Sequence, residues 1–83
     1  MSEYQRWEER YRVPEYVFGK APNYFLASCK PLLPASGKAL AVADGEGRNG
    51  VWLAEQGLDV LSIDFSLSAQ AKARALAIER GVA

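Results

Sequence analysis

The residues with the clearest chemical meaning form a glycine-rich turn from Asp44 to Asn49, Asp-Gly-Glu-Gly-Arg-Asn, between an apolar run and a segment with helical periodicity. A second apolar run ends on Asp64, 19 residues after Gly45. In a mononucleotide-binding βαβ unit, such a turn brings backbone N–H groups and a helix N-terminus to a ligand. The acid that ends the second strand accepts hydrogen bonds from ribose hydroxyls. The spacing therefore predicts a site for a nucleoside-containing cofactor.

The charged residues of the turn help to distinguish between NAD and S-adenosylmethionine as the cofactor. Gly45 to Gly50 matches the dinucleotide pattern G-x-G-x-x-G, which by itself favours NAD. However, Asp44 and Glu46 place two carboxylates where a pyrophosphate would lie, with only Arg48 to offset them. A like-charge contact at about 4 Å costs on the order of 4 kcal/mol at an effective dielectric near 20. A ligand that carries an ammonium and a sulfonium, such as S-adenosylmethionine, tolerates these acids. A P-loop is excluded because no Gly-Lys-Ser/Thr follows the glycines.

Two helices are expected before the glycine turn. Ser2 and Gln5 have the spacing of a capping box, which predicts a helix over residues 2 to 12 that Pro14 ends. After a loop over residues 15 to 21, Pro22-Asn23 opens a helix from Tyr24 to about Lys30, which Pro31 and Pro34 bend or stop.

The rest of the chain reads as strand, helix, strand, helix. Lys38 to Ala43 fits a buried parallel strand, and Arg48 to Gln56 fits a short helix that Gly57 ends. Asp59 to Ile63 is the second strand, and Ser66 caps a helix from Leu67 to Arg80. The alanines at 69, 73 and 77, with Leu76, form a smooth face suited to packing on a sheet.

This order predicts an α/β fold with parallel strands and a right-handed crossover. We divide the single domain into a helical segment, 1–37, that covers the cofactor site and a βαβα unit, 38–83. Two strands are few, because parallel sheets normally have more strands and helices on both faces. We therefore expect an open sheet edge, with homo-oligomer formation, a loose state, or a chain cut from a longer parent as its consequences.

Composition excludes several classes of site and partner. Ten basic and ten acidic residues cancel and are scattered, so no footprint for nucleic acid is visible. No apolar run approaches the roughly 20 residues that span a bilayer, and we expect a cytoplasmic protein. The chain has one cysteine and no histidine, so a Cys/His nucleophile pair, an internal disulfide and a His-ligated zinc are excluded, and no metal site is expected.

Two segments of the chain resemble a known family. Residues 43 to 57 and 60 to 66, which contain Asp-Gly-Glu-Gly-Arg-Asn-Gly and Ile-Asp-Phe-Ser, look like the first two motifs of class I S-adenosylmethionine-dependent methyltransferases. The upstream residues 7 to 11 and 16 to 23 are similar to the N-terminal pattern of the tellurite-resistance and thiopurine-methyltransferase-like branch. The resemblance implies the N-terminal portion of a Rossmann-like methyltransferase fold. The family's later motifs and its acceptor pocket would lie beyond residue 83.

The resemblance also implies roles for individual residues. The loop under the methionyl part of the cofactor would be Gly45, Glu46 and Gly47, and Asp64 would bind the ribose hydroxyls. Arg48 and Asn49 would open the helix at that loop. The N-terminal segment over the cofactor would contain Trp7, Tyr11, Tyr16 and Asn23. The chain departs from the family pattern at Ala41, where an acid is usual, and at Ala43, where the first glycine is usual; Asp44 would supply the carboxylate from a nearby position.

The leading hypothesis is thus methyl transfer from S-adenosylmethionine to an unidentified acceptor, with no catalytic residue in this segment. One alternative is a fragment of an NAD(P)-binding dehydrogenase. The other is a non-catalytic remnant or binding module whose exposed sheet edge pairs with a partner.

Overall fold

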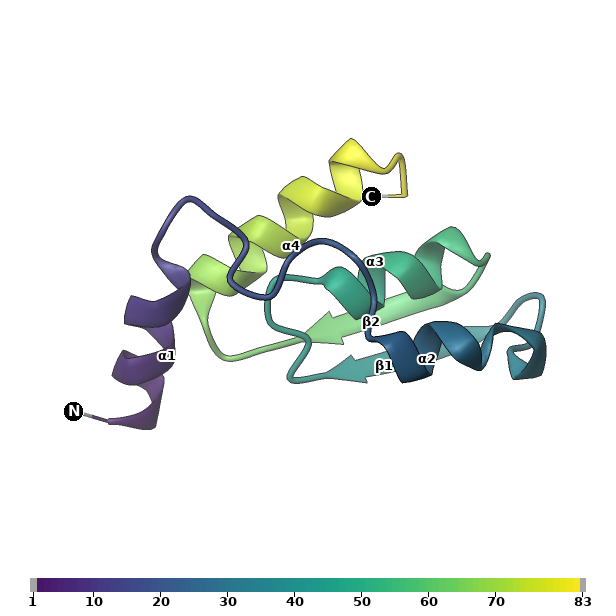
Figure 1. The fold of residues 1–83 in the computed structure, drawn as a ribbon, viewed down its shortest axis with the longest axis horizontal. Coiled ribbons are helices and arrows are strands. Elements are labelled where there is room, and N and C mark those ends of the chain that lie inside the picture. Colours follow the sequence, from purple (N-terminus) through teal and green to yellow (C-terminus); the bar gives the residue numbers. More distant parts are fainter. Residues whose placement is uncertain (1, 83) are drawn as a thin grey trace.

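The computed structural model describes residues 2 to 82, which form a mixed α/β fold with two parallel strands and four α-helices (Figure 1). The order of elements and the parallel pairing are as predicted. None of the helices in this range has the length and apolar character that crossing a bilayer requires. In chain order the elements are α1 (Glu3–Tyr11), α2 (Tyr24–Ser28), the 3₁₀ helix η1 (Lys30–Leu32), β1 (Lys38–Val42), α3 (Arg48–Glu55), β2 (Asp59–Ile63) and α4 (Leu67–Glu79).

Local signals set most of the helix ends. The Ser2 hydroxyl accepts the Gln5 N–H at 3.1 Å and the Gln5 side chain accepts the Ser2 N–H at 3.0 Å, which confirms the capping box. The second helix is shorter than predicted, because α2 ends at Ser28 and η1 follows. Pro31 explains the break, since proline disfavours α-helical geometry in the residue before it and has no N–H to donate.

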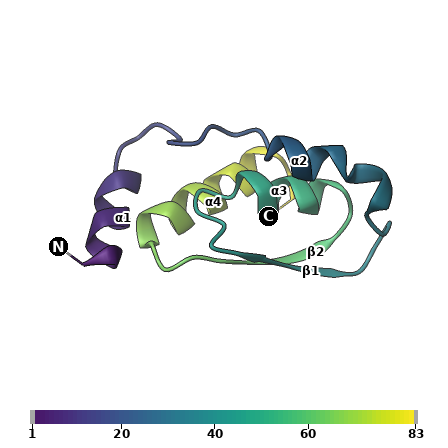
Figure 2. The same ribbon diagram turned by 60° about the horizontal axis from the view of Figure 1, so that its bottom comes forward.

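The sheet is buried on one face only. Figure 2 shows α2, α3 and α4 on one side of the two strands and no element on the other. Along β1 and β2 the side chains alternate, so Leu40 pairs in register with Leu61, and Val42 with Ile63, on the bare face. These four side chains are between 42% and 66% exposed. The prediction that Lys38 to Ala43 forms a buried strand is therefore wrong for one of its faces, because no element of the described chain packs there.

Helix α4 packs differently from the prediction. Ala69 and Leu76 are buried, as a core-facing stripe would be. However, α4 packs chiefly on α3 and α1 rather than on the strands. This follows from the strand order, because β2 is an edge strand in the described part of the chain and no further strand of residues 2 to 82 lies beneath the helix.

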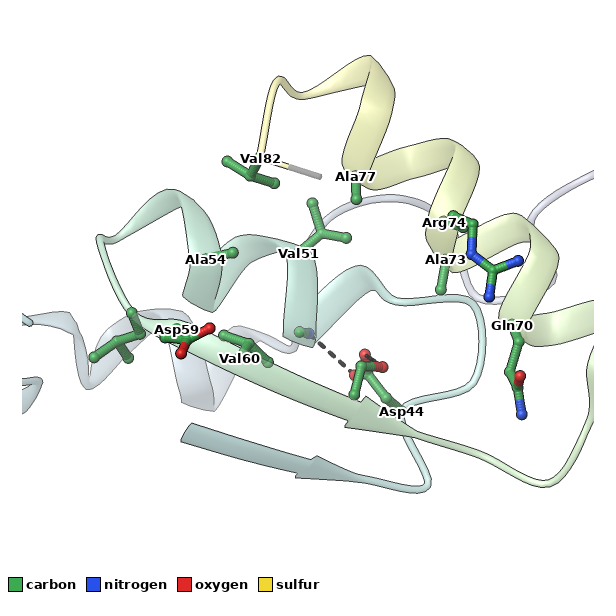
Figure 3. Close-up of a pocket in the computed structure, with 13 residues that line it drawn as sticks. Asp44, Val51, Ala54, Asp59, Val60, Gln70, Ala73, Arg74, Ala77 and Val82 are labelled. Atoms are coloured by element: carbon green, nitrogen blue, oxygen red, sulfur yellow. Dashed lines mark hydrogen bonds between the residues drawn. The ribbon is translucent and has the colours of Figure 1, made fainter. Parts of the chain in front are cut away.

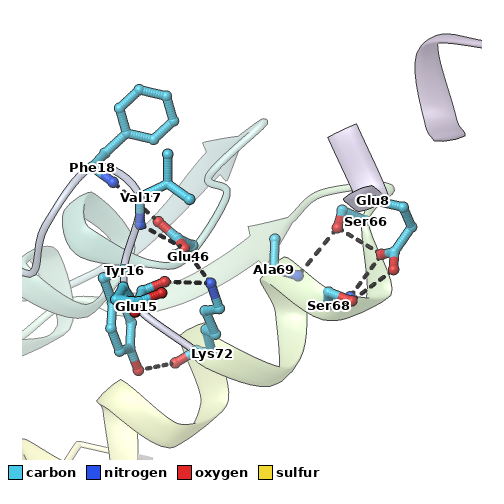
Figure 4. A network of polar contacts seen from close by, with 10 residues as sticks. All are labelled: Glu8, Glu15, Tyr16, Val17, Phe18, Glu46, Ser66, Ser68, Ala69 and Lys72. Atoms are coloured by element: carbon cyan, nitrogen blue, oxygen red, sulfur yellow. Dashed lines mark hydrogen bonds and ion pairs between the residues drawn. The ribbon is translucent and has the colours of Figure 1, made fainter. Parts of the chain in front are cut away.

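Buried carboxylates fasten the N-terminal segment to the rest of the fold (Figure 4). Glu8 of α1 accepts hydrogen bonds from the Ser66 hydroxyl at 2.7 Å, the Ser68 N–H at 2.8 Å and the Ser68 hydroxyl at 2.6 Å. Ser66 and Ser68 begin α4, where unpaired N–H groups and the helix dipole favour a negative charge. The hydrogen bonds from Ser68 and Ser66 lower the pKa of Glu8 from 4.5 to about 2. Glu8 is thus a cap for α4 that comes from another helix.

We predict that Glu8→Gln lowers the melting temperature at neutral pH. The variant should also lose less of its melting temperature than the parent does as the pH falls. Because the folded pKa is below the unfolded value, the contribution of Glu8 is present above pH 4.5 and is lost as the pH falls toward 2. The measurement is the melting temperature of parent and variant from pH 7 to pH 2, and the two curves should converge in acid. Glu9→Gln, on the exposed side of α1, is the matched control and should leave the profile unchanged. A constant gap between parent and Glu8→Gln at every pH would contradict the assignment.

Candidate functional site

The glycine turn and the acid of the second strand meet at the carboxyl ends of β1 and β2. Asp64 accepts the Gly45 N–H at 2.9 Å through one carboxylate oxygen and the Ser66 N–H at 2.9 Å through the other. Each carboxylate oxygen has a second lone pair, so the acid can still accept a ligand hydroxyl. The predicted neighbourhood of turn and acid is therefore present in the fold.

Two adjoining cavities open at this edge of the sheet. The larger, which we call the aromatic cavity, has a volume of about 580 Å³ and is lined by Trp7, Tyr11, Ala43, Ile63, Asp64 and Phe65. The smaller, the polar cavity, has a volume of about 160 Å³ and is lined by Tyr11, Phe18, Ala43, Asp44, Gly45, Glu46, Arg48 and Asn49. They share Tyr11 and Ala43. An apolar chamber beside a polar one suits a ligand with a flat ring at one end and charged groups at the other.

Aromatic residues of α1 form one wall of the site. The rings of Trp7 and Tyr11 stack with their centroids 5.6 Å apart, and Tyr11 contacts Phe18 with centroids 6.4 Å apart. Burial, together with the negative charges of Asp64 and Glu46, raises the pKa of Tyr11 above 10.0, so its hydroxyl remains a donor at neutral pH. A Cβ at Gly45 would lie 2.9 Å from that hydroxyl oxygen. The turn and α1 are thus in close contact through Tyr11.

Glu46 holds the N-terminal segment rather than presenting a free carboxylate. It accepts the Val17 N–H at 3.0 Å and the Phe18 N–H at 3.3 Å, and it pairs with Lys72 of α4 at 2.8 Å (Figure 4). The residue is only 3% exposed. Because Lys72 offsets this charge, the electrostatic argument against a pyrophosphate in the turn is weaker than the sequence suggests.

Asp44 is also engaged inside the fold. Its carboxylate accepts the Gly50 N–H at 3.0 Å and the Ser62 hydroxyl at 2.6 Å. Burial raises the pKa of this carboxyl, while the hydrogen bonds from Ser62 and Gly50 act in the opposite direction. Asp44 therefore joins the turn to α3 and β2, although it also lines the polar cavity.

Gly47 contacts a helix and lines neither cavity. A Cβ at this position would lie 2.7 Å from the Ala73 Cβ and 2.9 Å from the Ala73 Cα. Its φ of 88° is in the left-handed region. The glycine therefore permits the close approach of α4, and its place under the methionyl part of a cofactor stays a prediction.

The other residues expected at the site divide into two groups. Arg48 and Asn49 line the polar cavity at the start of α3. Tyr16 and Asn23 line neither cavity: the Tyr16 hydroxyl donates to the Lys72 carbonyl at 2.8 Å, and the Asn23 N–H donates to the Asn49 side-chain oxygen at 2.7 Å. Tyr16 and Asn23 thus hold the N-terminal segment against the residues that do line the site.

Three further residues line the cavities without a role predicted from the sequence, namely Phe65, Phe18 and Ala43. Phe65 follows Asp64 directly, and Phe18 lies in the segment expected over the cofactor, so their positions offered a signal. Ala43 has a φ of 52°, in the left-handed region where a side chain is strained. Among residues 2 to 82, no group of three or more acidic or cysteine side chains could hold a metal ion.

We predict that Gly47→Ala lowers the free energy of unfolding by about 1–3 kcal/mol more than Gly19→Ala does, because only the first substitution overlaps a neighbouring helix. Both glycines have a similar left-handed φ, 88° and 79°, so the backbone strain of the two variants is matched. Urea denaturation of the two variants measures the difference. Equal losses would mean that packing against Ala73 does not require the glycine.

We also predict that Ala43→Gly raises the free energy of unfolding by about 0.5–1 kcal/mol, since the left-handed strain relieved exceeds the added chain entropy. Ala41→Gly, two residues earlier in β1, should instead lower it by about 0.5–1 kcal/mol, because an extended position gains nothing from glycine. Urea denaturation compares both variants with the parent. A loss of stability in Ala43→Gly would contradict this reading of the turn.

No protein-family model matches the chain, and no curated protein sequence matches it.

Proposed function

We propose that the chain is the N-terminal, cofactor-binding portion of a Rossmann-like methyltransferase that uses S-adenosylmethionine. The observation that carries the proposal is the aromatic cavity, which joins an acid at the end of β2 to an apolar wall of Trp7 and Phe65. A nucleoside needs both features, because its ribose presents paired hydroxyls and its base presents a flat apolar surface.

Each part of the cofactor has a suitable set of residues. Asp64 would accept hydrogen bonds from the ribose hydroxyls while still holding the Gly45 N–H. The rings of Trp7 and Phe65 would flank the base. The amino and carboxylate groups of the methionyl part would lie in the polar cavity, where Asp44 provides negative charge and Arg48 provides positive charge.

The chemistry requires little from these residues beyond position. When bound, S-adenosylmethionine would supply an electrophilic methyl group: an acceptor nucleophile would form a bond to the methyl carbon in line with the C–S bond, which breaks and leaves its electron pair on the sulfur of a neutral thioether. The chain would orient the cofactor through Asp64 and the turn, and Trp7 and Tyr11 would keep water from one side of it. In-line displacement at a sulfonium requires no dedicated acid or base from this segment, so we assign no catalytic residue and no acceptor.

Dinucleotide binding is the competing function, and one observation favours it. The Lys72 ammonium lies 2.8 Å from Glu46, which removes part of the repulsion that a pyrophosphate would meet in the turn. Binding of S-adenosylhomocysteine or of NADH distinguishes methyltransferase from dinucleotide-binding function.

The test is a calorimetric titration of the folded chain with S-adenosylhomocysteine and, in parallel, with NADH. We expect saturable binding of the first ligand only. Asp64→Ala should weaken this binding by on the order of 1–3 kcal/mol, or about 5- to 150-fold, because it removes a charged acceptor from two hydroxyls. Asp59→Ala, at the opposite end of the same strand, is the matched control and should leave the affinity unchanged.

Each other outcome has a definite meaning. Binding of NADH alone would replace the methyltransferase proposal with dinucleotide binding. No binding of either ligand by a chain with a folded circular dichroism spectrum would contradict both. If the parent and Asp64→Ala bound S-adenosylhomocysteine with equal affinity, Asp64 would not be a cofactor-binding residue.

A further inference from the structure

An asparagine followed by a glycine lies in the first turn of α3. Asn49 and Gly50 are the second and third residues of this helix, and Asn49 also lines the polar cavity. Asparagine is a chemically labile residue, most of all before glycine, because glycine has no Cβ to shield the backbone nitrogen that attacks the side-chain amide. The pair is otherwise typical of tight turns rather than of helices. Its presence at the start of α3 has a structural cause.

The carboxylate of Asp44 requires the glycine at position 50. A Cβ built on Gly50 would overlap the Asp44 Oδ2 atom. The Ser62 hydroxyl donates to the same oxygen at 2.6 Å, and both Asp44 and Gly50 are buried. A side chain at position 50 would therefore displace the Asp44 carboxylate from its place in the fold.

The same carboxylate holds the backbone nitrogen of Gly50. The first N–H groups of a helix have no partner within the helix, and the residue before α3, Gly47, has no side chain to accept them. Instead the Asp44 Oδ1 atom accepts the Gly50 N–H at 3.0 Å (Figure 3). Asp44 thus imposes the labile pair by excluding a larger residue, and it also binds the nitrogen on which the lability depends.

The folded backbone keeps this nitrogen away from the side chain of Asn49. Attack on the side-chain carbonyl carbon closes a five-membered ring, which needs a ψ at Asn49 far from the helical value of about −42°. The Asn49 side-chain oxygen accepts the Asn23 N–H at 2.7 Å, while no hydrogen bond within residues 2 to 82 uses its amide nitrogen. Loss of the amide therefore requires the first turn of α3 to open.

We propose that Asn49 is a deamidation site that Asp44 protects in the folded chain, and that it reacts when the first turn of α3 opens. The released Gly50 nitrogen gives its proton to hydroxide and forms a bond to the side-chain carbonyl carbon of Asn49. The C–N bond of the side-chain amide breaks, and its nitrogen leaves as ammonia with a proton taken from water. Water then opens the resulting cyclic imide at either carbonyl, which yields aspartate or isoaspartate.

Either product changes the polar cavity. Aspartate at position 49 adds a negative charge to a cavity that Asp44 and Arg48 also line. Isoaspartate in addition lengthens the backbone of the first turn by one methylene, which moves the acceptor that holds the Asn23 N–H. The reaction therefore links the age of the chain to the shape and charge of the polar cavity.

Mass spectrometry of the full chain, incubated in its folded state at neutral pH, measures the reaction. Digestion by a lysine-specific protease places Asn49 and Asn23 in different peptides. Asn23 precedes Tyr24, whose side chain shields the attacking nitrogen, so it is the internal control and should remain intact. The peptide acetyl-Gly-Arg-Asn-Gly-Val-Trp-amide has the sequence around Asn49 without the fold. It should deamidate at least about tenfold faster than the folded chain, because it needs no opening step.

Variants at the protecting carboxylate test the role of Asp44. Asp44→Ala releases the Gly50 N–H and should accelerate deamidation of Asn49 by at least about tenfold. Ser62→Ala removes the other hydrogen bond of the same carboxylate and is the matched control, which should change the rate much less. Asp44→Asn keeps a carbonyl oxygen that can accept from Gly50, so its rate should lie between those of the parent and Asp44→Ala. Circular dichroism establishes that each variant is folded.

Hydrogen exchange of the Gly50 amide in the parent gives a second measurement that needs no variant. Exchange and ring closure both require release of the Gly50 N–H from Asp44. Urea at concentrations below the unfolding transition should therefore accelerate both reactions in parallel.

Several results would overturn the proposal. These are deamidation of the folded chain at the rate of the free peptide, an equal acceleration in Asp44→Ala and Ser62→Ala, or an unchanged Asn49 rate in Asp44→Ala although Gly50 exchanges faster. If Asp44→Ala does not fold, the urea series decides, and a deamidation rate that stays constant while Gly50 exchange rises would also contradict the proposal. None of these measurements uses a cofactor, so this proposal and the proposed function can fail independently.

Discussion

The buried carboxylate of Glu46 is the constraint on which the rest of the structure depends. It receives two backbone N–H groups from Val17 and Phe18 and the ammonium of Lys72, so one side chain joins the glycine turn, the N-terminal segment and α4. A carboxylate in a residue that is only 3% exposed is tolerated because both of its oxygens accept hydrogen bonds and one of them pairs with an ammonium. Without that pairing the loop after α1 would lose its attachment to Glu46, and the contacts of Glu8, Tyr16 and Asn23 would remain to hold the segment. The shape of the polar cavity thus follows from an interaction that lies largely outside it.

Local chemistry made much of the fold predictable. Ser2, Asn23 and Ser66 cap helices where the sequence places them, and the spacing from Gly45 to Asp64 brings the turn and the acid together. The partners of Glu8 and Glu46 were not predictable, because they lie 26 or more residues away and depend on how α1 and α4 meet. The covered face of the sheet was not predictable either. Side chains alternate between two faces along β1, but only the structure shows which face the helices cover.

The two glycines of the turn have different neighbours, although the G-x-G-x-x-G motif treats them alike. Gly45 lies beside the Tyr11 hydroxyl at the cavities, whereas Gly47 lies against Ala73 and serves the packing of α4. Ala43 adopts a left-handed backbone that glycine would adopt without strain, and it lines both cavities. Backbone strain of this kind persists only when the surroundings fix the conformation, and here the two residues after Ala43 are held, since the Asp44 N–H donates to the Ile63 carbonyl and the Gly45 N–H to Asp64.

The two open surfaces of the sheet differ in what they can recognise. The bare face offers Leu40, Val42, Leu61 and Ile63, whose attraction to a partner is apolar and has little directional preference. The β2 edge offers directional backbone donors and acceptors at fixed spacing, at Val60 and Ser62, which pair with no other strand among residues 2 to 82. Hydrogen bonds weaken steeply with poor geometry, so an edge of this kind fixes the register of its partner. Within residues 2 to 82 the helices cover only one face of the sheet, so the apolar side chains of the bare face and the backbone groups of the β2 edge both lack a partner. The bare face follows from the one-sided helix layer, whereas the edge follows from the number of strands in the described chain.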